Sequence, residues 1–166
     1  MSLYNVIKKD LTMEMIRNNI KYKLDTDNKT AKVKYSIDYA FDVIIPEYIV
    51  YENEKYKVTS IGVDAFYGCT DLTAVIIPNS VTKIEKGAFF GCTKLESINI
   101  PDSVTEIGED AFFDCESLQT IEIPKSITKI GENAFAYCKS LQNITIPTSI
   151  KSSMLKRIGL TSSMMC

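Results

Sequence analysis

The stretch from Gly87 to Pro101 reads GAFFGCTKLESINIP, and close variants of it occur three more times in the chain. The four copies align without a gap at a period of 23 residues. They begin at Val58, Val81, Val104 and Ile127. A coil of this length cannot bury its own apolar side chains, whereas stacked coils cover one another and share a continuous core. The sequence therefore predicts a solenoid built from four full repeats.

The end of each repeat alternates between apolar and polar residues. In the second repeat, Ile98 and Ile100 fall on one face of a strand, while Ser97 and Asn99 fall on the other. Pro101 has no N–H with which to continue a ladder, so it ends the strand. We expect the isoleucine face to lie in the core and the Ser/Asn face to be exposed to solvent.

The middle of each repeat has the pattern Ala-Phe-x-x-Cys-x-x-Leu. Its spacings of three and four place the apolar groups on one side of a single helical or 3₁₀ turn. Successive strands are expected to pair in parallel about 4.8 Å apart. The predicted fold is thus an α/β solenoid, a right-handed superhelix with parallel strands on its concave face and short helical or 3₁₀ turns on its convex face. The repeats fill residues 58–149, and residues 150–166 form a degenerate C-terminal repeat or tail.

Residues 1–57 are expected to cap the first coil, whose core would otherwise meet water. Two β-hairpins are predicted, one around the turn-like segment DTDNK at 25–29 and one around ENE at 52–54. Before them, apolar residues at spacings of three and four predict an amphipathic helix that packs on the core or caps it. Its apolar positions are Leu3, Val6, Ile7, Leu11, Met15 and Ile16.

The four in-register copies of AFxxCxxLxxIxIP resemble the 23-residue leucine-rich repeats of BspA-like surface proteins. The stretch from Ile20 to Gly62 also resembles the leader that such proteins place before their first repeat. The resemblance implies a non-catalytic, adhesin-like module of the cell surface or of a secreted protein, which binds host proteins, matrix proteins or neighbouring cells. The alternative is a structural spacer, a fragment of a larger repeat protein with no partner of its own. The first residues lack the apolar core of a signal peptide, so a cytoplasmic location stays open.

Cysteines recur at the same point of every coil, at Cys69, Cys92, Cys115 and Cys138. Adjacent coils would bring them about 5 Å apart, which is compatible with disulfides as well as with free thiols. Ligands in a line cannot surround one metal ion tetrahedrally. We expect four small, buried, apolar side chains. Cys166 lies outside this register and is expected to be exposed.

Several classes of function are excluded or disfavoured by composition. The chain has no histidine and no Gly-rich phosphate loop, so we predict no catalytic, cofactor or metal site and no enzyme activity. The repeats carry 6 basic and 12 acidic residues, a balance that disfavours nucleic acid. The longest apolar runs span only a few residues, far short of the roughly 20 that a transmembrane helix needs.

The outward positions of the repeat strands are the predicted protein-binding site. They vary from repeat to repeat, while the inward isoleucines and valine hardly change, and a concave sheet can contact an extended partner without altering the core. The alternative is that these positions are tolerated surface residues. The eight positions are Ala74, Ile76, Ser97, Asn99, Thr120, Glu122, Asn143 and Thr145.

A second candidate surface follows the core phenylalanine on the convex side. Tyr67, Phe90 and Phe113 occupy one register, where the fourth repeat has Ala136. Three aligned aromatic rings could serve self-association or a protein partner. The alternative is that they are half-buried between coils.

Overall fold

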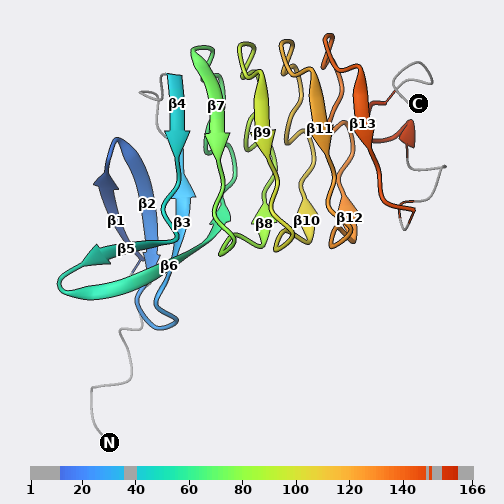
Figure 1. The fold of residues 1–166 in the computed structure, drawn as a ribbon. Helices are drawn as coiled ribbons and strands as arrows, with labels where there is room; N and C mark the ends of the chain where they lie inside the picture. The colour runs from blue at the N-terminus through green and yellow to red at the C-terminus, as the bar shows by residue number, and fades with distance from the viewer. Residues whose placement is uncertain (1–11, 36–40, 149, 151–154, 161–166) are drawn as a thin grey trace, which may run out of the picture.

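The computed structural model describes residues 12–35, 41–148, 150 and 155–160. Its repeats form a β-solenoid whose coils stack side by side along one axis (Figure 1). The strands of the N-terminal part are β1 (Thr12–Arg17), β2 (Ile20–Asp25), β3 (Thr30–Lys34), β4 (Phe41–Ile44), β5 (Tyr48–Tyr51) and β6 (Glu54–Ile61). Those of the repeats are β7 (Leu72–Ile76), β8 (Lys83–Ile84), β9 (Ser97–Asn99), β10 (Glu106–Ile107), β11 (Thr120–Glu122), β12 (Lys129–Ile130) and β13 (Asn143–Thr145).

Each coil contributes a strand to two parallel ladders, which appear in Figure 1 as an upper and a lower row. The first ladder holds the predicted strands, in the sheets β4-β7-β9 and β11-β13. In it Val75 pairs with Ile98 and Ile121 pairs with Ile144, so the predicted stacking of inward side chains is confirmed. Sheet hydrogen bonds do not continue from β9 to β11, although the two strands lie in contact.

The second ladder runs through β6, β8, β10 and β12. It was not predicted, because its repeat strands are only two residues long and alternate too briefly to be recognised. Strands of the N-terminal part extend it in the order β1-β2-β3-β6, in which β3 pairs with β6 in parallel and the other two pairs are antiparallel. Strand β5 pairs with the other edge of β6 in antiparallel register. One sheet therefore joins the N-terminal part to the repeats.

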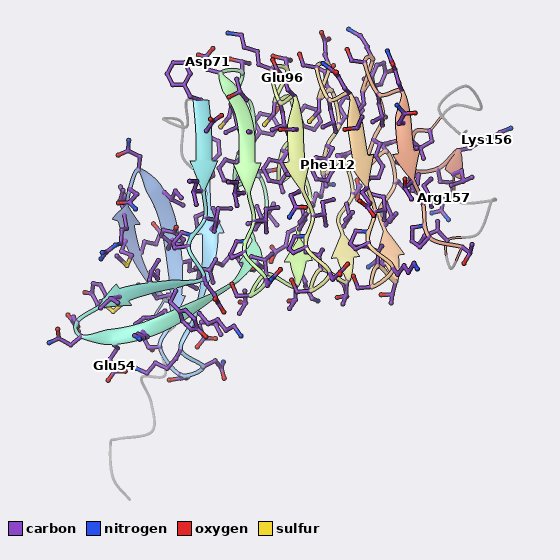
Figure 2. All side chains as sticks on the ribbon, in the orientation of Figure 1. Glu54, Asp71, Glu96, Phe112, Lys156 and Arg157 are labelled. Atoms are coloured by element: carbon purple, nitrogen blue, oxygen red, sulfur yellow. The ribbon has the colours of Figure 1, made fainter. Side chains whose placement is uncertain are left out.

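The core between the ladders is built from side chains stacked at 23-residue intervals. Phe66, Phe89, Phe112 and Phe135 are fully buried. Their rings stack nearly parallel, with centroids 5.0, 5.2 and 5.5 Å apart. Phe112 lies between neighbouring coils in Figure 2, whereas Asp71 and Glu96 lie on the outer rim. Each coil thus buries its aromatic ring against the coils on both sides, as a solenoid requires.

The predicted helical or 3₁₀ turns are wrong, because the Ala-Phe-x-x-Cys segments are runs of isolated turns. In the first repeat Asp64 and Gly68 both have left-handed φ angles, of 53° and 68°, which leaves only residues 65–67 between them. The Phe66 N–H donates to the Ala88 carbonyl of the next coil at 2.8 Å. Alternate residues bond within the segment, as from the Tyr67 N–H to the Asp64 carbonyl at 3.1 Å, while the residues between them pair with the next coil, so the hydrogen bonds of a continuous helix do not form.

The N-terminal part is only partly as predicted. The two hairpins are confirmed, since β2 pairs with β3 and β5 with β6 in antiparallel register. The helix is wrong where it can be tested, because residues 12–17 form strand β1. Met13 and Met15 pack on the core while Glu14 and Ile16 are exposed, an alternation of period two. The earlier positions of that helix lie outside the described residues.

The four repeat cysteines are free and buried, as expected. The Cys92 Sγ–H donates to the Phe66 carbonyl at 3.1 Å, and Cys115 and Cys138 make the same bond to the preceding coil. Burial raises the pKa of the Cys69 thiol from 9.0 to about 11 and that of Cys138 to about 12. These side chains therefore fill the turn and link adjacent coils as protonated thiols. Cys166 lies outside the described residues.

Candidate binding face

The eight predicted residues lie on the outward side of the first ladder, and all but the half-buried Ala74 are exposed. Ala74 and Ile76 lie opposite Ser97 and Asn99, and the remaining four pair in the same way across β11 and β13. We call the outward side of β4, β7, β9, β11 and β13 the strand face. The structure brings the predicted residues together there.

Strand β4 extends this face by one more strand, which the sequence analysis missed. It pairs with β7 in parallel, so that Asp42 lies opposite Ala74 and Ile44 opposite Ile76. The Thr73 hydroxyl donates to the Asp42 carboxylate at 2.7 Å. A signal was present, because the segment DVIIPE at 42–47 matches AVIIPN at 74–79 almost residue for residue.

The N-terminal end of the strand face is apolar. Ile44 and Ile76 are neighbours across two strands, yet 66% and 55% of their surfaces are exposed. Phe41, at the start of β4, is 71% exposed and has a left-handed φ of 62°, which an aromatic residue rarely adopts. Large apolar side chains held in water on the same edge mark a surface suited to contact another molecule.

The middle of the strand face is polar and hollow. A depression of about 350 Å³ opens beside the junction of β9 and β11, where the sheet is interrupted. It is lined by Asn79, Ile98, Asn99, Ile100, Pro101, Asp102, Glu122 and Pro124. Within the described part of the chain, neither Asp102 nor Glu122 has a cationic partner within ion-pair distance.

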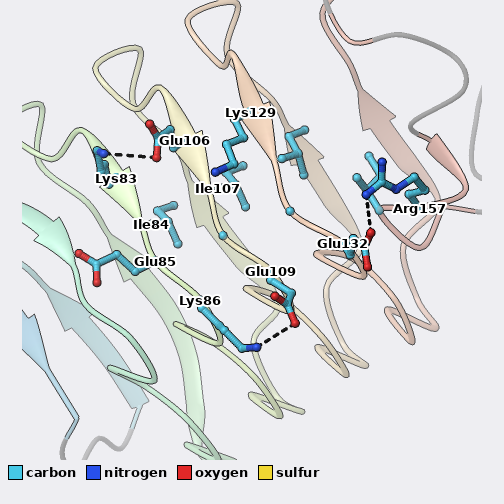
Figure 3. Close-up of a pocket in the computed structure, with 14 residues that line it drawn as sticks. Lys83, Ile84, Glu85, Lys86, Glu106, Ile107, Glu109, Lys129, Glu132 and Arg157 are labelled. Atoms are coloured by element: carbon cyan, nitrogen blue, oxygen red, sulfur yellow. Dashed lines mark hydrogen bonds and ion pairs between the residues drawn. The ribbon is translucent and has the colours of Figure 1, made fainter.

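A larger groove of about 550 Å³ runs along the second ladder, across β8, β10 and β12 (Figure 3). Most of its charges are paired between adjacent coils. Lys83 lies 3.3 Å from Glu106, and Lys86 lies 2.8 Å from Glu109. The hydrogen bond to Glu109 raises the pKa of Lys86. Exposed pairs of this kind contribute little stability, but they leave the groove close to neutral.

Gly108 is one of the residues that line this groove. A Cβ at that position would lie 2.5 Å from the backbone of Glu85, so the residue has to be glycine for the coils to approach this closely. The groove therefore has a structural origin in the packing of the coils.

The second predicted patch is a row of stacked aromatic rings. The centroids of Tyr67 and Phe90 are 5.0 Å apart, and those of Phe90 and Phe113 are 4.7 Å apart. Phe90 and Phe113 are half-buried, while Tyr67 is exposed. Tyr137 takes the last place instead of Ala136, with its ring tilted by 51° against Phe113. Much of the row's surface is thus used in packing between coils.

No group of three or more metal-ligating side chains was found among the described residues. Within the same residues, no helix has both the length and the apolar character that crossing a bilayer demands.

Comparison with known proteins agrees with this architecture. Residues 58–165 match six copies of the family described as BspA type leucine rich repeat region. A solved leucine-rich repeat protein of T. pallidum is 34% identical with a TM-score of 0.73, and the match covers 84% of this chain and 63% of that one. A leucine-rich repeat protein of Bacteroides capillosus is 29% identical with a TM-score of 0.70, covering 79% and 96% of the two chains.

A third solved structure, the pneumococcal vaccine antigen PcpA, is 27% identical with a TM-score of 0.68. The match covers 84% of this chain but only 39% of the pneumococcal one. The chain therefore spans less than two thirds of the length of both the T. pallidum and the pneumococcal protein. No curated protein matches it.

Proposed function

Because the chain belongs to the BspA-type leucine-rich repeat family, we propose that it is a non-catalytic protein-binding module whose partner docks on the strand face. The observation that carries this proposal is the contrast between the two sides of the first ladder. The inward residues Val75, Ile98 and Ile121 are buried and nearly uniform, whereas the outward residues change from coil to coil and are exposed. The outward side can therefore specify a partner while the core stays the same.

The exposed apolar pair supports this assignment over that of a simple solvated surface. Ile44 and Ile76 contribute nothing to the buried core, and their exposure to water is unfavourable by about 25 cal/mol for each Å² of apolar surface. A partner that covered them would recover that free energy. Hot spots of protein interfaces commonly combine such an apolar anchor with polar groups at its rim.

We place the module at the cell surface or in a secreted protein, where its partner would be a protein of the host, of the matrix or of a neighbouring cell. The support is the family itself and the similarity to a pneumococcal vaccine antigen. The chain would then be the recognition part of a longer assembly or of a longer polypeptide.

The test compares two variants, each of which replaces two side chains by alanine. Asn99→Ala/Glu122→Ala alters the strand face, and Lys83→Ala/Glu106→Ala removes an ion pair from the groove on the other ladder. A partner captured by the immobilised wild-type chain from extracellular or cell-surface proteins is identified, and its affinity for each variant is measured by surface plasmon resonance. We expect at least a tenfold loss for the strand-face variant alone, with both melting temperatures within about 2 °C of the wild type.

Equal affinities for the two variants would refute the strand face as the binding site. Absence of any saturable partner for the wild-type chain would instead favour the structural spacer.

A further inference from the structure

We propose that the strand face takes an extended segment of its partner, with an apolar side chain on Ile44 and Ile76 and a lysine or arginine side chain in the hollow between β9 and β11. This inference rests on the proposed function and names the chemistry of the partner. It is drawn from the order of side chains along one row of the strand face.

The row crosses all five strands of the first ladder. Ile44 lies opposite Ile76, Ile76 opposite Asn99, and Glu122 opposite Thr145. Asn99 and Glu122 are equivalent positions of consecutive repeats, on strands in contact. The row therefore changes from apolar at β4 and β7 to polar and acidic at β9 and β11.

The charge of the strand face favours a cation in the hollow. Asp102 and Glu122 line the hollow together with the side-chain amides of Asn79 and Asn99, and no lysine or arginine is among its lining residues. The outward residues of the first ladder include the carboxylates of Asp42 and Glu122 but no basic group. Two carboxylates that make no ion pair with a described residue create a negative potential that attracts a positively charged side chain.

In the second ladder the carboxylates are paired with basic side chains, in contrast to those of the hollow. There Glu106 and Glu109 each lie within 3.3 Å of a lysine of the preceding coil. A basic side chain from a partner would have to displace those lysines, whereas in the hollow the carboxylates have no ion pair among the described residues. The volume of about 350 Å³ lies at the small end for ligand pockets and suits one long side chain.

Strand spacing sets the distance between the two contacts. The apolar pair spans β4 and β7, and the hollow lies beside the junction of β9 and β11, so their centres are two strand intervals apart, or about 10 Å. A segment in the polyproline II conformation rises about 3.1 Å per residue, with every third side chain on the same side. Such a segment would place residues i and i+3 about 9 Å apart. The expected partner motif is therefore an apolar and a basic residue separated by two others.

A random dodecapeptide library displayed on phage tests this inference with the purified full chain as target. We expect the selected peptides to be enriched in Leu, Ile, Val or Phe three residues from Lys or Arg. A synthetic peptide of the selected sequence should lose about tenfold in affinity when its basic residue is replaced by Gln, and should bind more weakly as salt is raised.

Three variants of the chain assign each contact. Asp102→Asn/Glu122→Gln should abolish the preference for a basic residue, and Ile44→Ser/Ile76→Ser the preference for an apolar one. Glu106→Gln, whose carboxylate belongs to the second ladder, should change neither preference.

Selected peptides that bind the strand face without a basic residue, or that keep their affinity for Asp102→Asn/Glu122→Gln, would overturn the inference and leave the proposed function standing. Peptides insensitive to every strand-face variant would count against both.

Discussion

Replacing Phe112 by alanine tests whether stacking between coils holds this protein together. The ring is fully buried, and its centroid lies 5.2 Å from that of Phe89 and 5.5 Å from that of Phe135. Phe113→Ala is the matched control, because it deletes the same atoms from the next residue, whose side chain is only half-buried. The two variants have identical composition and differ only in where the ring is lost.

The magnitude follows from burial and from the number of lost ring contacts. Truncation of a fully buried phenylalanine typically costs about 3–5 kcal/mol, which includes the cavity that remains. Phe112 also loses two stacked neighbours, each of which contributes about 0.5–1.5 kcal/mol beyond the buried area. Phe113 loses its contacts with Phe90 and Tyr137 but leaves no enclosed cavity, so we expect a cost of about 1–2 kcal/mol.

Urea unfolding followed by far-ultraviolet circular dichroism measures both free energies. The expected result is a lower midpoint for Phe112→Ala than for Phe113→Ala, with a difference of at least about 1.5 kcal/mol in the free energy of unfolding. A cost for Phe113→Ala equal to or above that of Phe112→Ala would refute the argument that the inner aromatic ladder dominates the core. A broadened or biphasic transition for Phe112→Ala would show the coils on either side unfolding separately, as expected of a linear array.

Three further predictions concern Gly108 and the buried cysteines of the repeats. Gly108→Ala should lower the free energy of unfolding in urea by about 1–3 kcal/mol, because its Cβ would lie 2.5 Å from the Glu85 backbone. The control Glu85→Ala, at the equivalent position one repeat earlier, should lower it by less than about 1 kcal/mol. Equal costs for the two variants would contradict the packing argument. The folded chain should resist iodoacetamide at Cys92 and Cys115 at pH 8 and react when unfolded, as mass spectrometry would reveal. Burial raises the pKa of Cys69 from 9.0 to about 11, so its contribution to the free energy of unfolding is complete below pH 9 and falls as the pH rises toward 11. Urea unfolding should show the wild type losing stability between about pH 8.5 and 10.5, and Cys69→Ala should lose less by the share that this thiol contributes.

The stacking of coils could be predicted from the sequence because the same apolar residues recur at the same positions of every repeat. Ile98 and Ile121 recur 23 residues apart, and so do Cys92 and Cys115, which fixes the register between coils without further information. The two hairpins were predicted for a similar reason, since alternating residues flank a polar turn.

The turn conformation could not be predicted because the spacing of apolar residues is shared by helices and by the observed turns. The deciding feature is the left-handed φ, which occurs at Gly68 and Gly91 but also at Asp114 and Tyr137 in the same register. Glycine in all four repeats would have predicted a left-handed φ at this position, whereas aspartate and tyrosine rarely adopt one and so gave no such signal. The Asp114 N–H donates to the Ala136 carbonyl of the next coil at 2.9 Å, as the N–H groups of Gly68 and Gly91 do to Phe90 and Phe113.

The strand face was predicted in outline and missed in its details. Its eight outward residues follow from alternation alone, but β4 occurs only once outside the gapless repeats and so was not aligned with them. The hollow is lined by residues of three consecutive coils, among them Asn79, Asn99 and Glu122, so it depends on how the coils pack and not on the pattern within one repeat. Whether this face binds a partner, and which one, remains a prediction.

The direction of the hydrogen bonds between turns has a consequence for how such a protein can change in length. The N–H groups of one turn donate to carbonyls of the next, as from Phe89 to Ala111 and from Phe112 to Ala134, and residues 157 and 158 accept those of the fourth repeat. The turns at every junction between the four repeats present the same donors and acceptors, so an additional 23-residue unit inserted between two repeats would find a partner for each of these turn groups. Duplication of one unit would lengthen the rod and add a fresh outward strand in a single genetic event.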